Sequence, residues 1–154
     1  MYKFKHSVKD KNNLVTHNIW SCGKYLNDLT GFQITGQSEG TLTIEQDGIT
    51  ATRSTTNSTY FYTSFELSIP STAIGKDIII KIICKATDST VQSWLYKNNT
   101  WNNGGPVSIN SGSWVEVIKT TPIPENTTAV SFRFVPLRTA GNYIAINNIL
   151  VYIQ

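Results

Sequence analysis

Apolar and polar positions alternate with a period of two along the whole chain, and no window of a dozen residues carries apolar positions at helical spacing. In the run 60–69, one parity holds Phe61, Phe65, Leu67 and Ile69, and the other holds tyrosine and polar side chains. Successive side chains of a strand point to opposite faces. This run therefore predicts a strand with one face in the core and the other toward solvent.

The same alternation predicts strands throughout the sequence. The run from Ile78 to Ala86 is apolar at every second position, with isoleucines and lysines between, and predicts a central strand. Two further runs, 114–118 and 130–135, each have one clear core face. Shorter candidates are Leu14 to Ser21, Gly31 to Thr35, Thr41 to Gln46, Ile49 to Arg53, Val91 to Lys97, Val107 to Ile109 and Tyr143 to Ile153. Together these runs predict about eleven strands.

Turn signals separate the predicted strands. Asp47-Gly48 suits a tight hairpin with left-handed backbone, Gly104-Gly105-Pro106 predicts an irregular loop, and Pro122 and Pro124 predict an edge or a crossover. Many short strands with such punctuation predict an all-β protein, an antiparallel β-sandwich of the jelly-roll type.

Composition and charge exclude several classes. Of the 154 residues, 40% are hydrophobic and only 15% are charged, which describes a globular protein with a mostly uncharged polar surface. The formal charge of +3 is supplied by the lysine-rich start, and no Lys/Arg stripe follows, so we expect no nucleic-acid binding. No apolar run is long enough to cross a membrane, and the basic start leads to no apolar segment of a signal peptide. We expect a basic N-terminal extension over residues 1–13 and a single β-sandwich domain over residues 14–154.

The sequence contains few residues of the types that carry out catalysis, and we expect that this protein is not an enzyme. The only histidines are His6 and His17, and no nucleophile elbow, phosphate-binding glycine loop or His-x-x-x-His pair is present. Glu66 and Glu116 are the acidic residues that lie inside predicted strands, and whether they pair across a sheet stays open. We expect no cofactor or metal site, with a structural calcium in the turn carboxylates as the alternative.

Aromatic side chains among amides are the strongest functional signal. The segment 92–105 holds Trp94, Tyr96 and Trp101 beside four asparagines, including Asn99 and Asn102. A pyranose ring offers an apolar C–H face to an aromatic ring, and its hydroxyls need groups that donate and accept. Trp101 follows loop-type residues and is interpreted as a ligand contact, or else as a loop aromatic folded onto the sandwich edge. Whether the face of Trp94 and Tyr96 is core or groove stays open.

A second polar and aromatic face comes from Tyr60, Tyr62 and Glu66. These side chains would adjoin Lys81, Lys85 and Arg133 if the outward parities line one sheet, and such a concave sheet could hold a glycan. The alternative is an ordinary solvated face with cross-strand tyrosine packing. The candidate ligand-binding residues are Tyr60, Tyr62, Glu66, Trp94, Tyr96, Asn99, Trp101, Asn102 and Arg133.

The order of sequence features resembles a known family. The features are Asn12-Asn13-Leu14-Val15, the run Gly112 to Val117, Pro122-Ile123-Pro124, Val130 to Phe134, and the closing Tyr143 to Val151. They resemble the jelly-roll carbohydrate-binding modules of the galactose-binding-like superfamily, especially those attached to phage tail, baseplate and fibre proteins. The resemblance covers residues 12–154 and implies a ligand site on the concave sheet or at loop tips.

The resemblance also bears on calcium and on function. The family's last strand often carries an aspartate where Asn147 and Asn148 stand here, which argues against a family-type structural calcium. We expect a non-catalytic module of a phage tail or bacterial surface protein that binds a cell-surface glycan, located on a virion or outside the cell. Its other expected partners are further subunits of a larger assembly, including copies of itself. The alternative is a structural virion or adhesin domain whose aromatic surface packs against a neighbouring subunit.

Overall fold

The computed structural model describes residues 7–9, 15–21, 32–45, 48–57 and 59–154. These residues form ten β-strands and two short 3₁₀ helices. In chain order they are β1 (Ser7–Lys9), β2 (Val15–Ser21), β3 (Gln33–Thr35), η1 (Gln37–Glu39), β4 (Gly40–Glu45), β5 (Gly48–Arg53), β6 (Tyr62–Ser68), η2 (Ser71–Ala73), β7 (Asp77–Lys97), β8 (Thr100–Pro122), β9 (Thr127–Pro136) and β10 (Tyr143–Ile153). None of the helices in the described residues is long and apolar enough to cross a membrane.

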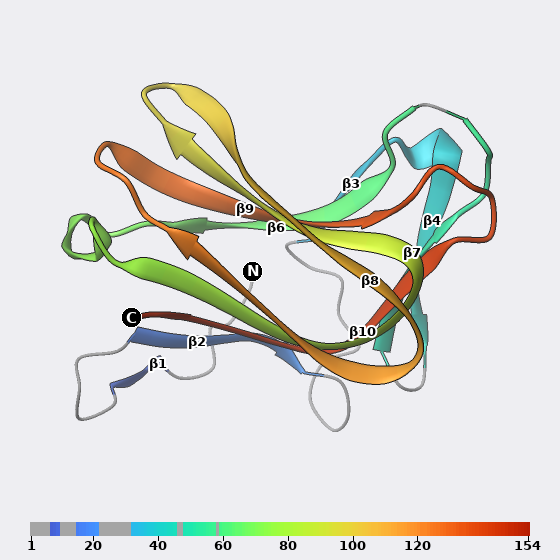
Figure 1. The fold of residues 1–154 in the computed structure, drawn as a ribbon, viewed down its shortest axis with the longest axis horizontal. Helices are drawn as coiled ribbons and strands as arrows, with labels where there is room; N and C mark the ends of the chain where they lie inside the picture. The colour runs from blue at the N-terminus through green and yellow to red at the C-terminus, as the bar shows by residue number, and fades with distance from the viewer. Residues whose placement is uncertain (1–6, 10–14, 22–31, 46–47, 58) are drawn as a thin grey trace.

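The strands form an antiparallel β-sandwich of the predicted jelly-roll type (Figure 1). One layer, which we call the groove sheet, runs in the order β3, β6, β9, the C-terminal half of β7 and the N-terminal half of β8. The other layer, the back sheet, contains β1, β2, β10, the N-terminal half of β7 and the C-terminal half of β8, and the β4–β5 hairpin adjoins β10. The two longest strands therefore belong to both layers.

β7 and β8 each merge two strands that the sequence predicted as separate. Between the two halves of β7, Asp88 has φ of 34° and the register to β8 shifts between Ala86 and Ser89. Polar residues interrupt the alternation there, but pairing with β8 and β10 continues up to Ala86 and pairing with β8 and β9 resumes at Ser89. The strand bends and crosses from one sheet to the other instead of ending.

The predicted loop at Gly104-Gly105-Pro106 is wrong for a related reason. These residues lie inside β8, where the register to β7 shifts between Gln92 and Trp94 and Gly105 has φ of 86°. A bulge absorbs the glycine that a regular ladder would not favour. The loop signal in the sequence therefore marks an irregularity within a strand.

The hairpin and the crossover predicted at the other turn signals are present, but the left-handed backbone predicted at Gly48 is not. β4 pairs with β5 so that Glu45 lies opposite Gly48, which is a hairpin with a two-residue connection. Asp47 lies outside the described residues, and Gly48 opens β5 without left-handed backbone; a side chain there would overlap the carbonyl oxygen of Ile146. Pro122 ends β8, and Pro124 lies in the connection that crosses to β9 in the groove sheet.

The core lies between the two sheets and confirms the predicted parities. It includes Phe61, Phe65, Ile69, Ile78, Ile80, Ile82, Cys84, Ala86, Val130, Phe132 and Phe134, all buried, with Leu67, Val115 and Val117 partly buried against them. β7 has strands on both sides along its length, which confirms that it is central. Burial raises the pKa of the Cys84 thiol to about 12, so this cysteine is a core residue without thiolate chemistry at neutral pH.

The N-terminal region is described only in part. β1 lies within the stretch that the sequence assigns to the basic extension, and it pairs antiparallel with β2. β2 in turn pairs with β10 at the edge of the back sheet. The rest of the predicted extension, residues 1–6 and 10–13, lies outside the described residues.

Candidate glycan-binding groove

Both aromatic clusters found in the sequence lie on the outer face of the groove sheet. The pairing of β9 and β7 places Arg133 opposite Gln92, and on its other side Arg133 lies opposite Ser64 of β6. In the next register rows, Trp94 lies opposite Asn103, and Tyr96 lies opposite Trp101. The sequence left two separate surfaces open, and the register joins them into one.

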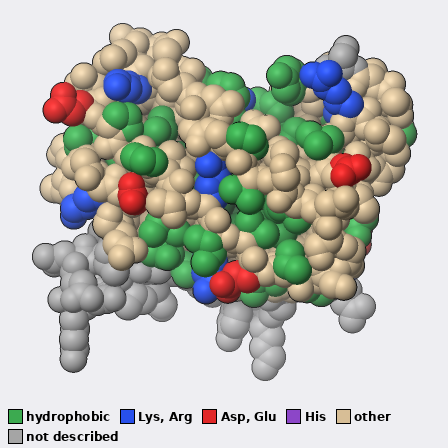
Figure 2. Space-filling model, viewed as in Figure 1, with side chains coloured by type: hydrophobic (Ala, Val, Ile, Leu, Met, Phe, Trp, Pro, Cys, Tyr) green, Lys and Arg blue, Asp and Glu red, His purple; other side chains and the backbone are tan. Residues whose placement is uncertain are grey.

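The central part of this face is hollowed. A groove of about 380 Å³ is lined by Thr35, Tyr60, Tyr62, Gln92, Trp94, Asn103, Arg133 and Val135. In Figure 1 the β7–β8 hairpin rises at upper left and the connection between β5 and β6 at upper right. Figure 2 shows the depression between these two lobes, with hydrophobic side chains on its slopes. The size is within the range of small-ligand sites.

Arg133 lies at the centre of the groove between two aromatic rings. Its guanidinium carbon is 4.2 Å from the centroid of the Trp94 ring and 4.8 Å from that of Tyr62. Because β9 lies between β6 and β7, the rings approach Arg133 from its two neighbouring strands. Among the described residues Arg133 has no ion pair, and its buried Nε atom has no hydrogen-bond partner. Cation–π contacts hold this charge in place without neutralising it.

A short hydrogen-bond chain fixes the wall of the groove formed by β7. The indole Nε1 of Trp94 donates to Oε1 of Gln92 at 3.0 Å, and Nε2 of Gln92 donates to the Thr90 hydroxyl at 3.1 Å. Each side chain is therefore held in one orientation before any ligand arrives. A pre-ordered wall lowers the conformational entropy that binding would otherwise remove.

Tyr60 forms the opposite wall and is the most exposed large hydrophobic side chain of the described residues, at 69%. It lies just before β6, and its carbonyl oxygen packs directly against Gly36, whose φ is 75°. A side chain at Gly36 would overlap that oxygen. The ring is therefore open to solvent while the backbone that carries it is closely packed.

A polar network braces the segment that leads to Tyr60. The guanidinium of the buried Arg53 donates to the carbonyl oxygens of Thr55, Asn57 and Thr59 and to Oδ1 of Asn57. The Glu39 carboxylate accepts hydrogen bonds from the Thr55 hydroxyl and the Asn57 amide. These bonds, that of Thr55 first, lower the pKa of Glu39. The segment thus has a defined conformation despite its lack of regular structure.

Trp101 occupies a strand and not a loop, which corrects the sequence-based interpretation. Asn98 and Asn99 have φ of 51° and 62° and form a two-residue turn, so that β8 begins at Thr100. This is the hairpin turn that requires left-handed backbone at both central positions. Trp101 and Tyr96 are partly buried, with ring centroids 5.2 Å apart. They continue the aromatic surface beyond Trp94 toward the hairpin tip.

Two predicted asparagines lie away from the groove. Asn99 is exposed at the hairpin tip, and Asn102 has the opposite parity from Trp101 in β8. Asn102 instead lines a second cleft of about 400 Å³ together with Leu95, Lys97, Ile123 and other residues. The structure therefore does not bring Asn102 together with Trp94 and Tyr60.

The predicted neighbourhood of Lys81 and Lys85 with Arg133 is wrong. Both lysines lie in the N-terminal half of β7, which belongs to the back sheet, because β7 crosses between the layers at Asp88. Lys81 pairs there with Glu116, Nζ to Oε2 at 2.8 Å, and Lys85 lies over the ring of Trp114 at 4.9 Å.

The two strand carboxylates are also separated. Glu66 is exposed on the groove sheet, whereas Glu116 lies on the outer face of the back sheet. They cannot act as the carboxylate pair of a glycosidase. No group of three or more His, Cys, Asp or Glu side chains that could hold a metal ion occurs in the part of the chain that the structure describes.

Several residues of the groove were not predicted. Gln92 and Asn103 were within the amide-rich segment, and their parity with Trp94 was the signal that could have selected them. Thr35 lines the groove because β3 pairs with β6, and no local sequence pattern predicts that pairing. Arg53 and Glu39 act at a distance from the groove, and their roles depend on contacts between segments far apart in sequence.

Comparisons with known proteins give the fold. No protein-family model and no curated protein sequence matches the chain. Among solved structures, the chain is similar to a family 29 carbohydrate-binding module from Piromyces equi, with 15% identity, 90% of each chain covered and a TM-score of 0.60. It is similar at 15% identity and a TM-score of 0.61 to a family 29 module complexed with cellulohexaose, covering 90% of this chain and 91% of that one.

A third neighbour comes from a virus. The chain is similar to the enzymatically active domain of tailspike protein 4 of bacteriophage CBA120, with 14% identity and a TM-score of 0.59. The match covers 80% of this chain and 19% of the tailspike. At such identities the likenesses establish the architecture, and this chain has the β-sandwich jelly roll that these carbohydrate-binding modules share.

Proposed function

We propose that this protein is a non-catalytic glycan-binding module whose ligand lies along the outer face of the groove sheet. The observation that carries the proposal is the placement of Tyr60, Tyr62 and Trp94 around one groove, with the amides of Gln92 and Asn103 beside them. Aromatic rings pack against the C–H face of a pyranose, and amides both donate to and accept from its hydroxyls. The groove meets both requirements.

The ligand is an oligosaccharide segment and not a single sugar. Tyr96 and Trp101 lie on the same face as Trp94, two residues further toward the hairpin tip, so aromatic surface continues past the end of the groove. A strand rises about 3.3 Å per residue, so this extension is close to the length of one further sugar ring. Support also comes from the neighbouring module complexed with cellulohexaose, since the same architecture binds an extended oligosaccharide in that protein.

We further propose the setting that the sequence resemblance implies, a module of the galactose-binding-like superfamily in a phage tail or bacterial surface protein. The likeness to a phage tailspike supports this setting. The glycan would then be a cell-surface polysaccharide, and the protein would act on the virion or outside the cell. Several copies on one assembly would raise avidity without new contacts.

A glycan array followed by tryptophan fluorescence tests the proposal. With a ligand found on the array, Trp94→Ala and Tyr60→Ala are each expected to weaken binding at least about tenfold, because buried aromatic contacts dominate such interfaces. Trp114→Ala is the matched control, since this indole lies on the back sheet beside Lys85. If no glycan binds, or if Trp114→Ala weakens binding as much as Trp94→Ala, the groove is not a glycan site.

The second candidate is a structural role in which the aromatic surface packs against another subunit. The exposure of Tyr60 at 69% favours it, since this ring on the groove face would gain from cover by a neighbour. Size-exclusion chromatography with light scattering separates the two candidates. An oligomer that dissociates on Tyr60→Ala, with no glycan bound by the parent, would support packing.

A further inference from the structure

Arg133 is a cation without an anionic partner among the described residues. It lines the groove, it has no ion pair with any described residue, and its buried Nε atom lacks a hydrogen-bond partner. Buried hydrogen-bond donors are almost always paired in folded proteins. We therefore expect an unpaired donor at a surface groove to bind an acceptor that the structure does not contain. The partner of Arg133 is therefore not among the described residues, and the groove leaves room for it to be a ligand.

The rings of Trp94 and Tyr62 determine how that partner can approach. They lie 4.2 Å and 4.8 Å from the guanidinium carbon and come from the strands on the two sides of β9. An approaching group therefore meets the guanidinium from the open side of the groove, where its N–H groups, the unpaired Nε–H included, are the donors to be satisfied. A planar guanidinium held in one orientation matches the geometry of a carboxylate.

An acidic side chain on this face, that of Glu66, does not neutralise Arg133, so the ligand can do so. Glu66 lies on the same face of β6, two residues from Ser64, which is opposite Arg133. At that diagonal spacing the side chains are neighbours, yet no ion pair forms between them. A neutral glycan would need no fixed charge at this place, because amides and hydroxyls recognise its hydroxyls as well.

We infer that the glycan is acidic and that a carboxylate of one of its sugar units pairs with Arg133 between the rings of Trp94 and Tyr62. This inference rests on the proposed function and names the class of its ligand. A uronic acid unit would place its carboxylate on Arg133 while the adjoining ring packs against the exposed Tyr60. The same recognition would disfavour the neutral form of the polymer, since the guanidinium would stay unpaired.

The experiment compares acidic polymers with their neutral counterparts. Binding to polygalacturonate, alginate and hyaluronan, and to the carboxyl-reduced form of each, is measured by affinity electrophoresis and isothermal titration calorimetry. At least one acidic polymer is expected to bind about tenfold more tightly than its reduced form, as charge-assisted hydrogen bonds allow. The preference is expected to decrease as the salt concentration rises.

The variant Arg133→Gln is expected to remove the preference, so that the acidic polymer and its reduced form bind this variant with equal affinity. Arg133→Lys keeps the positive charge but lacks the planar guanidinium, and it is expected to keep only part of the preference for the acidic polymer. Arg138→Gln is the matched control, because Arg138 is exposed and does not line the groove. Thermal unfolding of each variant shows that it is folded, and Arg133→Lys preserves the test if Arg133→Gln does not fold.

The outcomes separate the inference from the proposed function. Equal binding to acidic and reduced polymers, or an acidic preference that survives Arg133→Gln, overturns the inference while the groove stays a glycan site. Dextran sulfate separates a carboxylate from any polyanion, since equally tight binding to it overturns the assignment to a carboxylate. If no polymer binds in either form, the glycan-binding function fails as well.

Discussion

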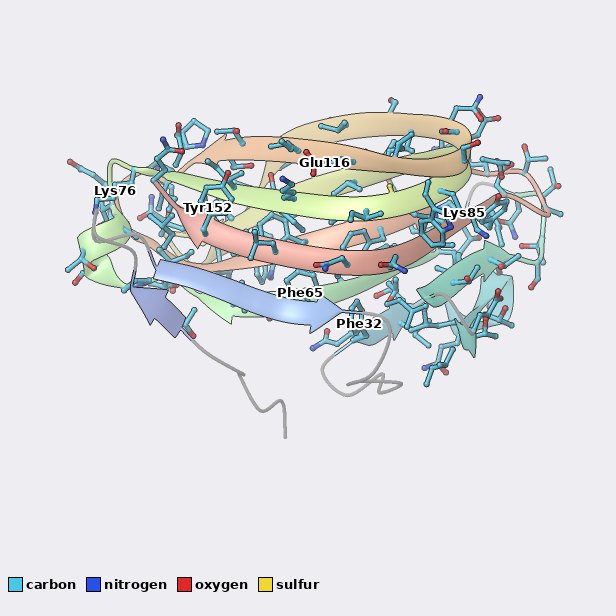
Figure 3. The ribbon with its side chains drawn as sticks, turned by 90° about the horizontal axis from the view of Figure 1, so that it is seen from below. Phe32, Phe65, Lys76, Lys85, Glu116 and Tyr152 are labelled. Atoms are coloured by element: carbon cyan, nitrogen blue, oxygen red, sulfur yellow. The ribbon has the colours of Figure 1, made fainter. Side chains whose placement is uncertain are left out.

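The two outer faces of the sandwich handle positive charge in opposite ways. On the back sheet, Lys81 has its own carboxylate, since Nζ lies 2.8 Å from Oε2 of Glu116. Figure 3 shows this face from below, with Glu116, Lys85 and Tyr152 labelled on it. On the groove sheet, Arg133 has two aromatic rings and no ion pair with the described residues. Within the described part of the chain, the exposed lysine of the back sheet is thus paired with a carboxylate, and the arginine of the groove sheet is not.

The same strand supplies both faces. The N-terminal half of β7 carries Lys81 and Lys85 on its outward parity, and the C-terminal half carries Gln92, Trp94 and Tyr96. The bend at Asp88 turns one alternating pattern into two surfaces of different chemistry. An ion pair leaves a surface with no net charge, which water solvates well. An unpaired cation held between aromatic rings leaves a positive surface, which favours an anionic partner.

Gly36→Ala is expected to have the largest effect on stability and on glycan binding. The structural change is expected on the groove sheet alone. The left-handed φ of 75° at Gly36 alone costs an alanine about 1 to 2 kcal/mol of folding stability. The new methyl group would also overlap the carbonyl oxygen of Tyr60, which must move and take the wall of the groove with it. We expect a larger loss of stability than from backbone strain alone, together with a loss of glycan binding.

Gly75→Ala is the control for Gly36→Ala. Gly75 has a similar φ of 80°, and an added Cβ atom there meets nothing within 4 Å. Both variants are compared by urea unfolding and by glycan titration. Equal losses of stability, with glycan binding kept in both, would mean that the contact between Gly36 and Tyr60 does not shape the groove.

Gln92→Glu places a carboxylate directly opposite Arg133, so that the groove sheet gains an ion pair like that of Lys81 with Glu116 on the back sheet. Residue 92 lies opposite Arg133, and a glutamate there can still accept the hydrogen bond from Trp94. Because the new carboxylate neutralises Arg133, we expect acidic glycans to bind about tenfold more weakly. Neutral polymers are expected to lose less affinity than acidic ones, as isothermal titration calorimetry would show.

Gln33→Glu is the control for Gln92→Glu, with the same change of charge one strand further away. Gln33 lies opposite Ser64, which separates it from Arg133 in the register row. The added charge is more distant and exposed, so a smaller effect is expected. An undiminished affinity for acidic glycans in Gln92→Glu would show that Arg133 does not recognise the ligand.

The sequence predicted the fold to the extent that local alternation determines it. Phe61, Phe65, Phe132 and Phe134 lie in the core as their parities indicated, because each strand has one buried face. The bend at Asp88 was not predictable, since polar residues end a strand as often as they bend one. The error in placing Lys81 and Lys85 beside Arg133 follows from that missed crossing alone.

The candidate site was predictable in composition and not in arrangement. Trp94, Tyr62 and Arg133 stand in three different strands, and only the pairing of β6, β9 and β7 brings them together. Pairing partners are set by tertiary structure, which no local pattern contains. Trp101 was placed in a loop because an Asn-Asn turn and a bulge at Gly105 both look like irregular chain.

Glu39→Gln is expected to weaken glycan binding slightly, by about threefold or less, since it replaces charge-assisted hydrogen bonds with neutral ones. Glu39 accepts from Thr55 and Asn57 and so braces the segment before Tyr60. These bonds lower the pKa of Glu39 in the folded protein. Its contribution to stability is therefore present above the carboxyl's ordinary pKa and is lost as the pH falls through the lowered one.

Urea unfolding of the parent and of Glu39→Gln over a range of pH checks this sign. The difference in stability between the two is expected to be constant at neutral pH and to shrink only in acid. Glutamate at position 45, exposed in β4 without such a network, serves as the control through Glu45→Gln. A difference that grows on acidification would contradict the assigned role of Glu39.

Glu116→Gln is expected to have the smallest effect, and it makes the back sheet resemble the groove sheet by leaving Lys81 unpaired. The hydrogen bond from Lys81 to Glu116 raises the lysine's pKa, so its contribution is fully present at neutral pH and is lost as the pH rises through that raised value. The pair is partly exposed, with 38% and 48% of the two side chains accessible, so the loss of stability should be small. Acidic glycans should bind Glu116→Gln and the parent equally, because no cation–π contact among the described residues orients Lys81 as Trp94 and Tyr62 orient Arg133. New binding of acidic glycans in this variant, retained when Arg133 is replaced by glutamine, would show that an unpaired cation on a sheet face is sufficient and that the rings are not required.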